Sequence, residues 1–226
     1  MDVKLPVIFI NFKTYTEATG EKALELAATC DKVAREKNAS IVLIVQATDI
    51  RLIASSVSLP IFAQHLDPVK PGSFTGHILP EAIKQAGAIG TILNHAENKK
   101  DNEFLKQAIQ RAKETGLKVL VCAETIQRAK EIALFPIKPD FIAVEPPELI
   151  GGDVSVSKAN PEIIRGTVQA VQSIASISVL AGAGVKTSAD IKKSIELGAK
   201  GVLLASGIVK ASEPEKVLIE LVQGLK

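Results

Sequence analysis

Glu145 is the side chain whose place in the sequence most strongly suggests chemistry. It directly follows the apolar run Phe141–Val144, and the chain then passes from a Pro-Pro pair at 146–147 to a Gly-Gly pair at 151–152. Proline fixes φ and glycine frees it, so a loop with these two ends can swing as one body between two hinges. Enzymes use such loops to exclude water during proton transfer. The segment therefore suggests a general base beside a lid, and the alternative is a solvated glutamate in a surface turn.

Four more polar side chains follow apolar runs of strand length. Asn11 and Lys13 come after the first run, and His95 and Glu97 come after the fourth. Considered alone, Lys13 would be interpreted as an ordinary solvated lysine and His95 as a structural histidine. If the runs are parallel strands of one barrel, they all end at the same face, and Lys13, His95 and Glu145 then share one mouth. Glu97 would lie at that mouth as a supporting carboxylate that orients Lys13 through a salt bridge.

Two glycine-rich turns follow the seventh and eighth apolar runs. They are Gly182-Ala183-Gly184 and Ala205-Ser206-Gly207. Barrels often hold a phosphate at these strand ends on backbone N–H groups and the N-terminus of a short helix, and small side chains let the backbone approach the anion. A single Gly-x-Gly usually marks only a tight turn. Two such turns at neighbouring strand ends indicate a phosphate site.

Eight apolar runs of strand length recur along the chain, and many of them are rich in β-branched residues. They cover residues 7–10, 41–45, 61–63, 91–93, 119–122, 141–144, 179–181 and 202–205. Segments with the apolar period of a helix lie between most of them, at residues 20–37, 49–56, 101–114, 125–134, 161–174, 188–197 and 213–225. Glycines at positions 87, 116 and 198 stand where helices are expected to end. Alternating strands and helices predict a parallel sheet, and eight such units match a closed (β/α)8 barrel of the α/β class.

An open doubly wound sheet is the alternative fold. A nucleotide-binding sheet of that kind needs a glycine-rich turn directly after its first strand, and this chain has Asn11-Phe12-Lys13 there. The closed barrel is therefore favoured. No linker, low-complexity segment or charge block divides the chain, so we expect one domain over residues 1–226.

The composition fits one large core and argues against several classes of protein. Of the 226 residues, 46% are hydrophobic and 23% are charged, and the net charge is +2. We expect no nucleic-acid partner because no basic stripe is visible. No apolar run is long enough to span a membrane or to serve as a signal peptide, so we also expect no membrane partner and a cytoplasmic location. Cys30 and Cys122 lack a partner motif and are expected to be reduced and buried. His65 and His77 lack ligand-like spacing with carboxylates, so we expect structural roles for them and no metal site.

Several segments, in their order along the chain, resemble the triosephosphate isomerase family, and specifically its short archaeal type. The segments are Asn11-Phe12-Lys13, Asn94-His95-Ala96-Glu97, and residues 144–152, 181–185 and 201–206. The stretch from Ala63 to Pro68, which runs into Thr75-Gly76-His77, resembles the third loop of that family. The resemblance extends over essentially the whole chain and implies the TIM-barrel fold.

The resemblance implies an aldose–ketose isomerase of glycolysis and gluconeogenesis, which interconverts dihydroxyacetone phosphate and D-glyceraldehyde 3-phosphate without a cofactor. It implies that Glu145 removes a proton from carbon and that neutral His95 polarises the carbonyl group as the enediolate forms. Lys13 and Asn11 would supply positive electrostatic stabilisation, and residues 146–152 would close over the substrate. The phosphate is expected to lie against backbone N–H groups of Ile150 or Gly152, Gly184, Ala205 and Ser206.

The resemblance also implies an assembly of several chains. In that family the third loop inserts into a partner subunit, so Thr75 is expected at an interface. The short archaeal branch tends to form tetramers. We therefore expect a homotetramer, and at least a dimer.

Two positions depart from the family's pattern. Ala96 stands where the family usually has a serine after the histidine, so a hydroxyl that can hold the base in the open state is absent, and Val45-Gln46 replaces an Ala-Pro-like end of the second strand. The alternative functions are another phosphate-binding barrel enzyme, such as a phosphosugar epimerase or a lyase of the tryptophan pathway, and a non-catalytic phosphometabolite-binding subunit. The former should not need a lysine, a histidine and a glutamate together, and the retained acid–base groups argue against the latter.

Overall fold

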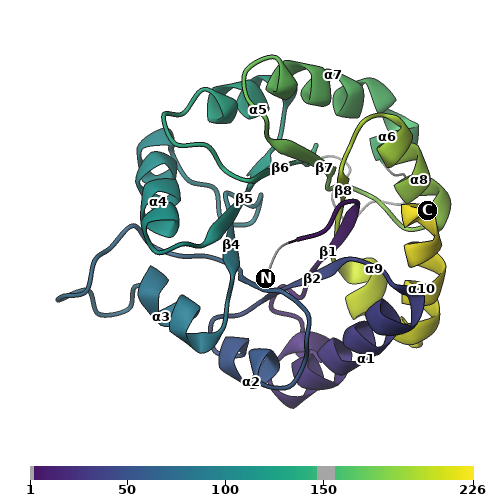
Figure 1. The fold of residues 1–226 in the computed structure, drawn as a ribbon, viewed down its shortest axis with the longest axis horizontal. Coiled ribbons are helices and arrows are strands. Elements are labelled where there is room, and N and C mark those ends of the chain that lie inside the picture. The colour runs from purple at the N-terminus through teal and green to yellow at the C-terminus, as the bar shows by residue number, and fades with distance from the viewer. Residues whose placement is uncertain (1–2, 147–155) are drawn as a thin grey trace.

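The computed structural model describes residues 3–146 and 156–226. Eight parallel strands pair in chain order, and β8 pairs back to β1, so the sheet closes into a barrel (Figure 1). The prediction of a closed (β/α)8 barrel is therefore confirmed. The strands are β1 Val7–Asn11, β2 Ile41–Val45, β3 Ile61–Ala63, β4 Gly90–Leu93, β5 Lys118–Ala123, β6 Phe141–Val144, β7 Ser178–Ala181 and β8 Gly201–Leu204.

Helices surround the strands as an outer ring (Figure 1). The α-helices are α1 Glu21–Lys37, α2 Ile50–Ala54, α3 Pro80–Ala86, α4 Asn102–Glu114, α5 Ile126–Ala133, α6 Val156–Ala159, α7 Pro161–Gln172, α8 Ser188–Glu196, α9 Ser206–Val209 and α10 Pro214–Leu221. Short 3-10 helices cover Thr16–Ala18 (η1) and Val222–Leu225 (η3). All seven helical segments expected from the sequence are present, although the last one ends in η3. Helices α3, α6 and α9 were not predicted as elements.

Local sequence signals set where several of these helices begin. Asp101 and Thr125 cap α4 and α5 by accepting hydrogen bonds from backbone N–H groups in the first turn. Thr187 and Asp190 form a reciprocal capping box at the start of α8. Proline occupies the start of α3, α7 and α10. A backbone N–H at this position would have no acceptor within the helix, so the missing N–H of proline costs no hydrogen bond. These caps fix the ends of the loops that lead from the strands into the helices.

Side chains of the strands alternate between the barrel interior and the surrounding helices. The interior cluster consists of Val7, Phe9, Val42, Ile44, Phe62, Ile92, Leu120, Cys122, Phe141, Ala143, Leu180 and Leu203. Phe9 packs edge-on against both Phe62 and Phe141, with ring centroids 5.3 Å apart in each pair. The interior is thus a packed core, and any substrate must bind at the loops. Cys30 and Cys122 are free and buried, as expected.

Gly201 closes the barrel at a point where no side chain fits. Its φ is 146°, and a Cβ built on it would lie 2.0 Å from the carbonyl oxygen of Val7 in β1. We expect Gly201→Ala to lower the free energy of unfolding by about 2–4 kcal/mol, because the strain and the clash add. Urea unfolding measures this loss. Gly207→Ala is the matched control, since a Cβ there meets nothing within 4 Å; an equal loss in the control would contradict the explanation.

Within the described residues, no helix is both long enough and apolar enough to span a membrane.

Candidate active site

A pocket of about 80 Å³ opens at the carboxyl ends of the strands. It lies over the end of the barrel that carries the loops following β1, β4, β6, β7 and β8. Among its lining residues are Asn11, Lys13, Tyr15, His95, Glu145, Gly182, Gly184, Lys186, Ala205 and Ser206. The pocket thus brings together seven of the expected catalytic and phosphate-binding residues, namely Asn11, Lys13, His95, Glu145, Gly184, Ala205 and Ser206, and Gly182 of the first glycine-rich turn. Ile150 and Gly152, the other two residues expected at the phosphate, lie outside the described residues.

Lys13 is held in one orientation by two neighbours. Its φ is 50°, which is unusual for a residue with a side chain. The backbone N–H of Lys13 donates to Oδ1 of Asn11 at 3.0 Å, and its Nζ lies 2.7 Å from Oε1 of Glu97. The lysine side chain is only 12% exposed, whereas that of Glu97 is 59% exposed. The charge of Lys13 therefore faces a largely desolvated pocket while its partner stays in water.

The His95 ring is oriented by the backbone of its own loop. Its Nδ1 accepts a hydrogen bond from the N–H of Glu97 at 3.2 Å, so the neutral ring carries its proton on Nε2. Burial, followed by the charge of Lys13, lowers the pKa of His95 below its usual 6.5, and Glu97 opposes this shift. The ring is therefore neutral at physiological pH. Its Nε2 lies 3.8 Å from Oε1 of Glu145, and both atoms belong to residues that line the pocket.

Glu145 is a buried carboxylate directly beyond β6. Its backbone N–H donates to the carbonyl of Ala123 at 2.9 Å, which extends the pairing of β6 with β5. Burial raises the pKa of Glu145 from 4.5 to about 7, while a hydrogen bond from the Cys122 thiol and the charge of Lys13 oppose the rise. A carboxyl group with this pKa can both accept and release a proton near neutral pH.

Gly182 provides the space that Glu145 occupies. A Cβ built on Gly182 would lie 2.4 Å from Cγ of Glu145. The sequence pattern assigned this glycine to a phosphate turn only, and the structure shows that it also makes room for the carboxylate. The other glycine of this turn, Gly184, has a φ of 66°, a conformation that favours glycine.

Glycines and small side chains line part of the pocket at the ends of β7 and β8. Ala205 and Ser206 come at the start of the short helix α9, directly after β8. The first N–H groups of a helix have no acceptor within it, so they are available to an anion. Tyr15 and Lys186 also line this pocket and were not singled out in the sequence. The sequence signal that could have identified them is their position, because Tyr15 is two residues after Lys13 and Lys186 is two residues after Gly184.

Thr75 lies in the segment between β3 and α3, which projects from the barrel (Figure 1). The neighbouring Phe74 is 46% exposed. A second hollow, of about 450 Å³, lies beside the active-site pocket and is lined by residues that include Lys13, Gln64, His65 and Glu97.

His65 and His77 have local contacts of a structural kind. Nε2 of His65 lies 3.3 Å from Oδ1 of Asp67, and the ring stacks on Phe104. The His77 ring packs edge-on against Phe74. Over residues 3–146 and 156–226, no group of three His, Cys, Asp or Glu side chains is arranged to hold a metal ion.

The fold and the pocket define the class of the protein: it is a (β/α)8-barrel enzyme equipped for acid–base chemistry. Comparison with known proteins makes this specific. The family model described as "Triosephosphate isomerase" matches residues 6–224. The chain is 46% identical to the "Triosephosphate isomerase" of Methanocaldococcus jannaschii over 96% of this chain and 99% of that protein. For the "Triosephosphate isomerase" of Methanosarcina acetivorans the identity is 44%, over 96% of this chain and 98% of that protein. The chain therefore belongs to the triosephosphate isomerase family, and the resemblance seen in the sequence is confirmed.

Proposed function

We propose that the protein interconverts dihydroxyacetone phosphate and D-glyceraldehyde 3-phosphate by proton transfer through an enediolate. The observation that carries this proposal is the approach of Oε1 of Glu145 to Nε2 of His95, 3.8 Å apart in one pocket. A substrate bound in this pocket against both groups would present its C–H bond to the carboxylate and its oxygen to the imidazole N–H. Family membership over residues 6–224 supports the same reaction.

In this proposal Glu145 is the base. Its ionised carboxylate takes the proton from the carbon next to the carbonyl group, and the electron pair of the C–H bond moves toward the carbonyl oxygen. Neutral His95 donates its Nε2–H to that oxygen, and the partly buried charge of Lys13, aided by Asn11, stabilises the developing negative charge. The proton of the original hydroxyl group then moves through His95 to the original carbonyl oxygen, and Glu145 returns its proton to the original carbonyl carbon, which completes the isomerisation.

The phosphate would bind on the opposite side of the pocket. Backbone N–H groups of Gly184, Ala205 and Ser206 are proposed to hold it, and these residues line the pocket. Ile150 and Gly152 remain proposed contacts because they lie outside the described residues. Another phosphate-binding barrel enzyme and a non-catalytic binder are not favoured, since the family match covers almost the whole chain.

A coupled assay on the purified protein tests the function. We expect turnover of D-glyceraldehyde 3-phosphate without nucleotide and after treatment with a chelator. Absence of turnover above background from protein with a cooperative unfolding transition would contradict the proposed function.

The pH profile of kcat/KM should report on Glu145. The base must be ionised and its pKa is about 7, so kcat/KM should rise by about tenfold per pH unit below 7 and level off above it. The pKa of His95 is lowered from 6.5, so His95 titrates at a lower pH than Glu145. Initial rates measured between about pH 5.5 and 8.5 check the profile. A flat profile would be inconsistent with Glu145 as the base.

We further propose that the chain acts in the cytoplasm as a homo-oligomer, a tetramer and at least a dimer. The hollow beside Lys13 and the projecting segment that carries Thr75 support a contact in which this segment of one copy enters the hollow of another. Thr75→Arg should then reduce the mass measured by light scattering, because a charge would be forced into the contact. Equal masses for the variant and the parent would exclude Thr75 from the interface. Cell fractionation tests the proposed cytoplasmic location.

A further inference from the structure

The two carboxylate oxygens of Glu145 have different surroundings. Oε1 lies beside His95 in the active-site pocket. Oε2 is buried, and within the described residues it has no hydrogen-bond partner. A buried polar atom without a partner costs about 1–3 kcal/mol, more if the group is charged, and ordered water is the usual remedy.

A small cavity lies on a second side of Glu145, and we call it the rear cavity. Its walls include Asn94, Ala96, Lys99, Cys122, Glu124 and Glu145, and of these only Glu145 also lines the active-site pocket. The volume is about 10 Å³. This is close to the minimum space that holds a single water molecule.

The side chains in the walls of the rear cavity do not provide Oε2 of Glu145 with a hydrogen bond. Nδ2 of Asn94 donates to the carbonyl of Cys122 at 2.9 Å, and its Oδ1 accepts from the N–H of Lys100 at 2.9 Å, so the amide of Asn94 is already engaged. Ala96 contributes a methyl group, which cannot form a hydrogen bond. The Cys122 thiol is a weak donor whose interaction with the carboxyl group lowers the pKa of Glu145, and it does not provide Oε2 with a hydrogen bond.

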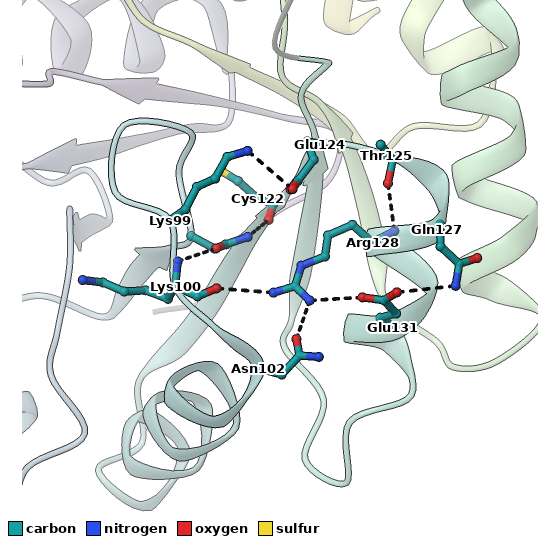
Figure 2. A network of polar contacts seen from close by, with 10 residues as sticks. Lys99, Lys100, Asn102, Cys122, Glu124, Thr125, Gln127, Arg128 and Glu131 are labelled. Carbon is teal, nitrogen blue, oxygen red and sulfur yellow. Dashed lines mark hydrogen bonds and ion pairs between the residues drawn. The ribbon is translucent and has the colours of Figure 1, made fainter.

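The rear cavity reaches toward solvent through an ion pair. Nζ of Lys99 lies 3.5 Å from Oε1 of Glu124, and these side chains are 52% and 31% exposed. Figure 2 shows this pair beside Cys122. The loop that carries Lys99 is anchored by Arg128 of α5, which donates to the carbonyl of Lys100 and to Asn102 (Figure 2). The cavity thus lies between a buried carboxyl group and an exposed, polar opening.

We propose that the rear cavity holds one water molecule, which hydrogen-bonds to Glu145 and exchanges protons between Glu145 and solvent past the Lys99–Glu124 pair. The exchange part rests on the proposed function, since it concerns the proton that Glu145 takes from the substrate. The route is separate from the substrate pocket. It therefore operates while the substrate covers the other face of the carboxyl group.

The exchange step is balanced without any further reactant. After proton abstraction Glu145 is a neutral carboxylic acid, and a half-turn about its broad, two-fold terminal torsion brings the O–H toward the rear cavity. The O–H gives its proton to the water, and the water returns a solvent hydron to the carboxyl group. One O–H bond breaks and one forms on Glu145, and no net charge or electron pair is transferred to solvent.

Isotope labelling tests the route. Unlabelled D-glyceraldehyde 3-phosphate is converted in D2O, and NMR gives the ratio of deuterium to protium at the carbon of dihydroxyacetone phosphate that receives the hydron. Ala96→Ser places a hydroxyl in the rear cavity and should lower this ratio by at least about threefold, because it displaces the exchanging water. Glu124→Leu replaces the charged side chain at the opening with an apolar one and should lower the ratio in the same direction. Ala175→Ser, a half-buried position away from the walls of both pockets, is the control and should leave the ratio unchanged.

A high-resolution crystal structure of the unliganded protein tests the water itself. We expect an ordered water about 2.7–3.2 Å from Oε2 of Glu145 in the parent and none in Ala96→Ser. An empty cavity in the parent would overturn the proposal. An unchanged labelling ratio in Ala96→Ser or in Glu124→Leu, with normal turnover in the parent, would overturn the exchange route while the isomerase function stands. A parent without turnover would remove the function and with it the exchange of a substrate proton, and the crystal structure would still decide the water site.

Discussion

Glu145→Gln is expected to lower kcat by about 10²- to 10⁴-fold, the usual contribution of a general base. The amide keeps the size of the side chain and cannot accept the substrate proton. Glu145→Asp should also lose about 10²-fold, because its carboxylate is retracted by about one carbon–carbon bond. Steady-state assays at pH 8 measure both losses. Glu103→Gln on α4 makes the same chemical change at an exposed position and should retain parental kcat.

Glu145→Gln should be more stable than the parent although it is less active. The folded protein raises the pKa of Glu145 from 4.5 to about 7, so the fold favours the protonated group. Its contribution to stability is fully present below about pH 4.5 and is lost as the pH rises through about 7. The neutral amide avoids this loss.

At pH 8 the Gln variant should therefore be more stable than the parent by an amount on the order of 3 kcal/mol, and the difference should nearly vanish at pH 4. Urea unfolding at the two pH values gives the comparison. A variant that loses activity and gains stability cannot owe its loss to misfolding. Lower stability than the parent at both pH values would argue against a buried, proton-binding carboxyl group.

The barrel could be predicted because almost every strand residue is buried, so each strand consists largely of an apolar run. Helices α1 and α4 could be predicted because they are long enough to repeat an apolar stripe. Helix α3 has only seven residues, two of them buried, so its period is too short to recognise, although its exit at Gly87 was visible. Helix α9 has four residues, which is too few to repeat an apolar stripe.

The site was predictable as far as topology alone determines it. Strand ends of a parallel barrel meet at one face, so Lys13, His95 and Glu145 could be placed together from their positions after apolar runs. What lies behind them depends on packing between strands. The room that Gly182 makes for the carboxylate and the rear cavity at Ala96 are set by side chains far apart in the sequence, and no local pattern encodes them.

Lys13→Met is expected to lower kcat/KM by about 10²- to 10³-fold, as for other groups that stabilise developing charge in a desolvated site. Nζ of Lys13 lies 2.7 Å from Glu97, and its side chain is 12% exposed, so its charge acts across the pocket with little screening by water. Methionine keeps the length and most of the packing of the lysine stem. Lys22→Met, at an exposed position of α1, should leave kcat/KM unchanged.

The pH profile of Lys13→Met separates an electrostatic role from a packing role. Lys13 lowers the pKa of Glu145, so removing its charge should raise that pKa and move the acidic limb of the kcat/KM profile to higher pH. Lys13 also lowers the pKa of His95, and its removal shifts that group in the same direction. A purely structural defect would scale the whole profile down without moving its midpoint. A reduced rate with an unmoved midpoint would therefore contradict the assignment of Lys13 as the electrostatic partner of the base.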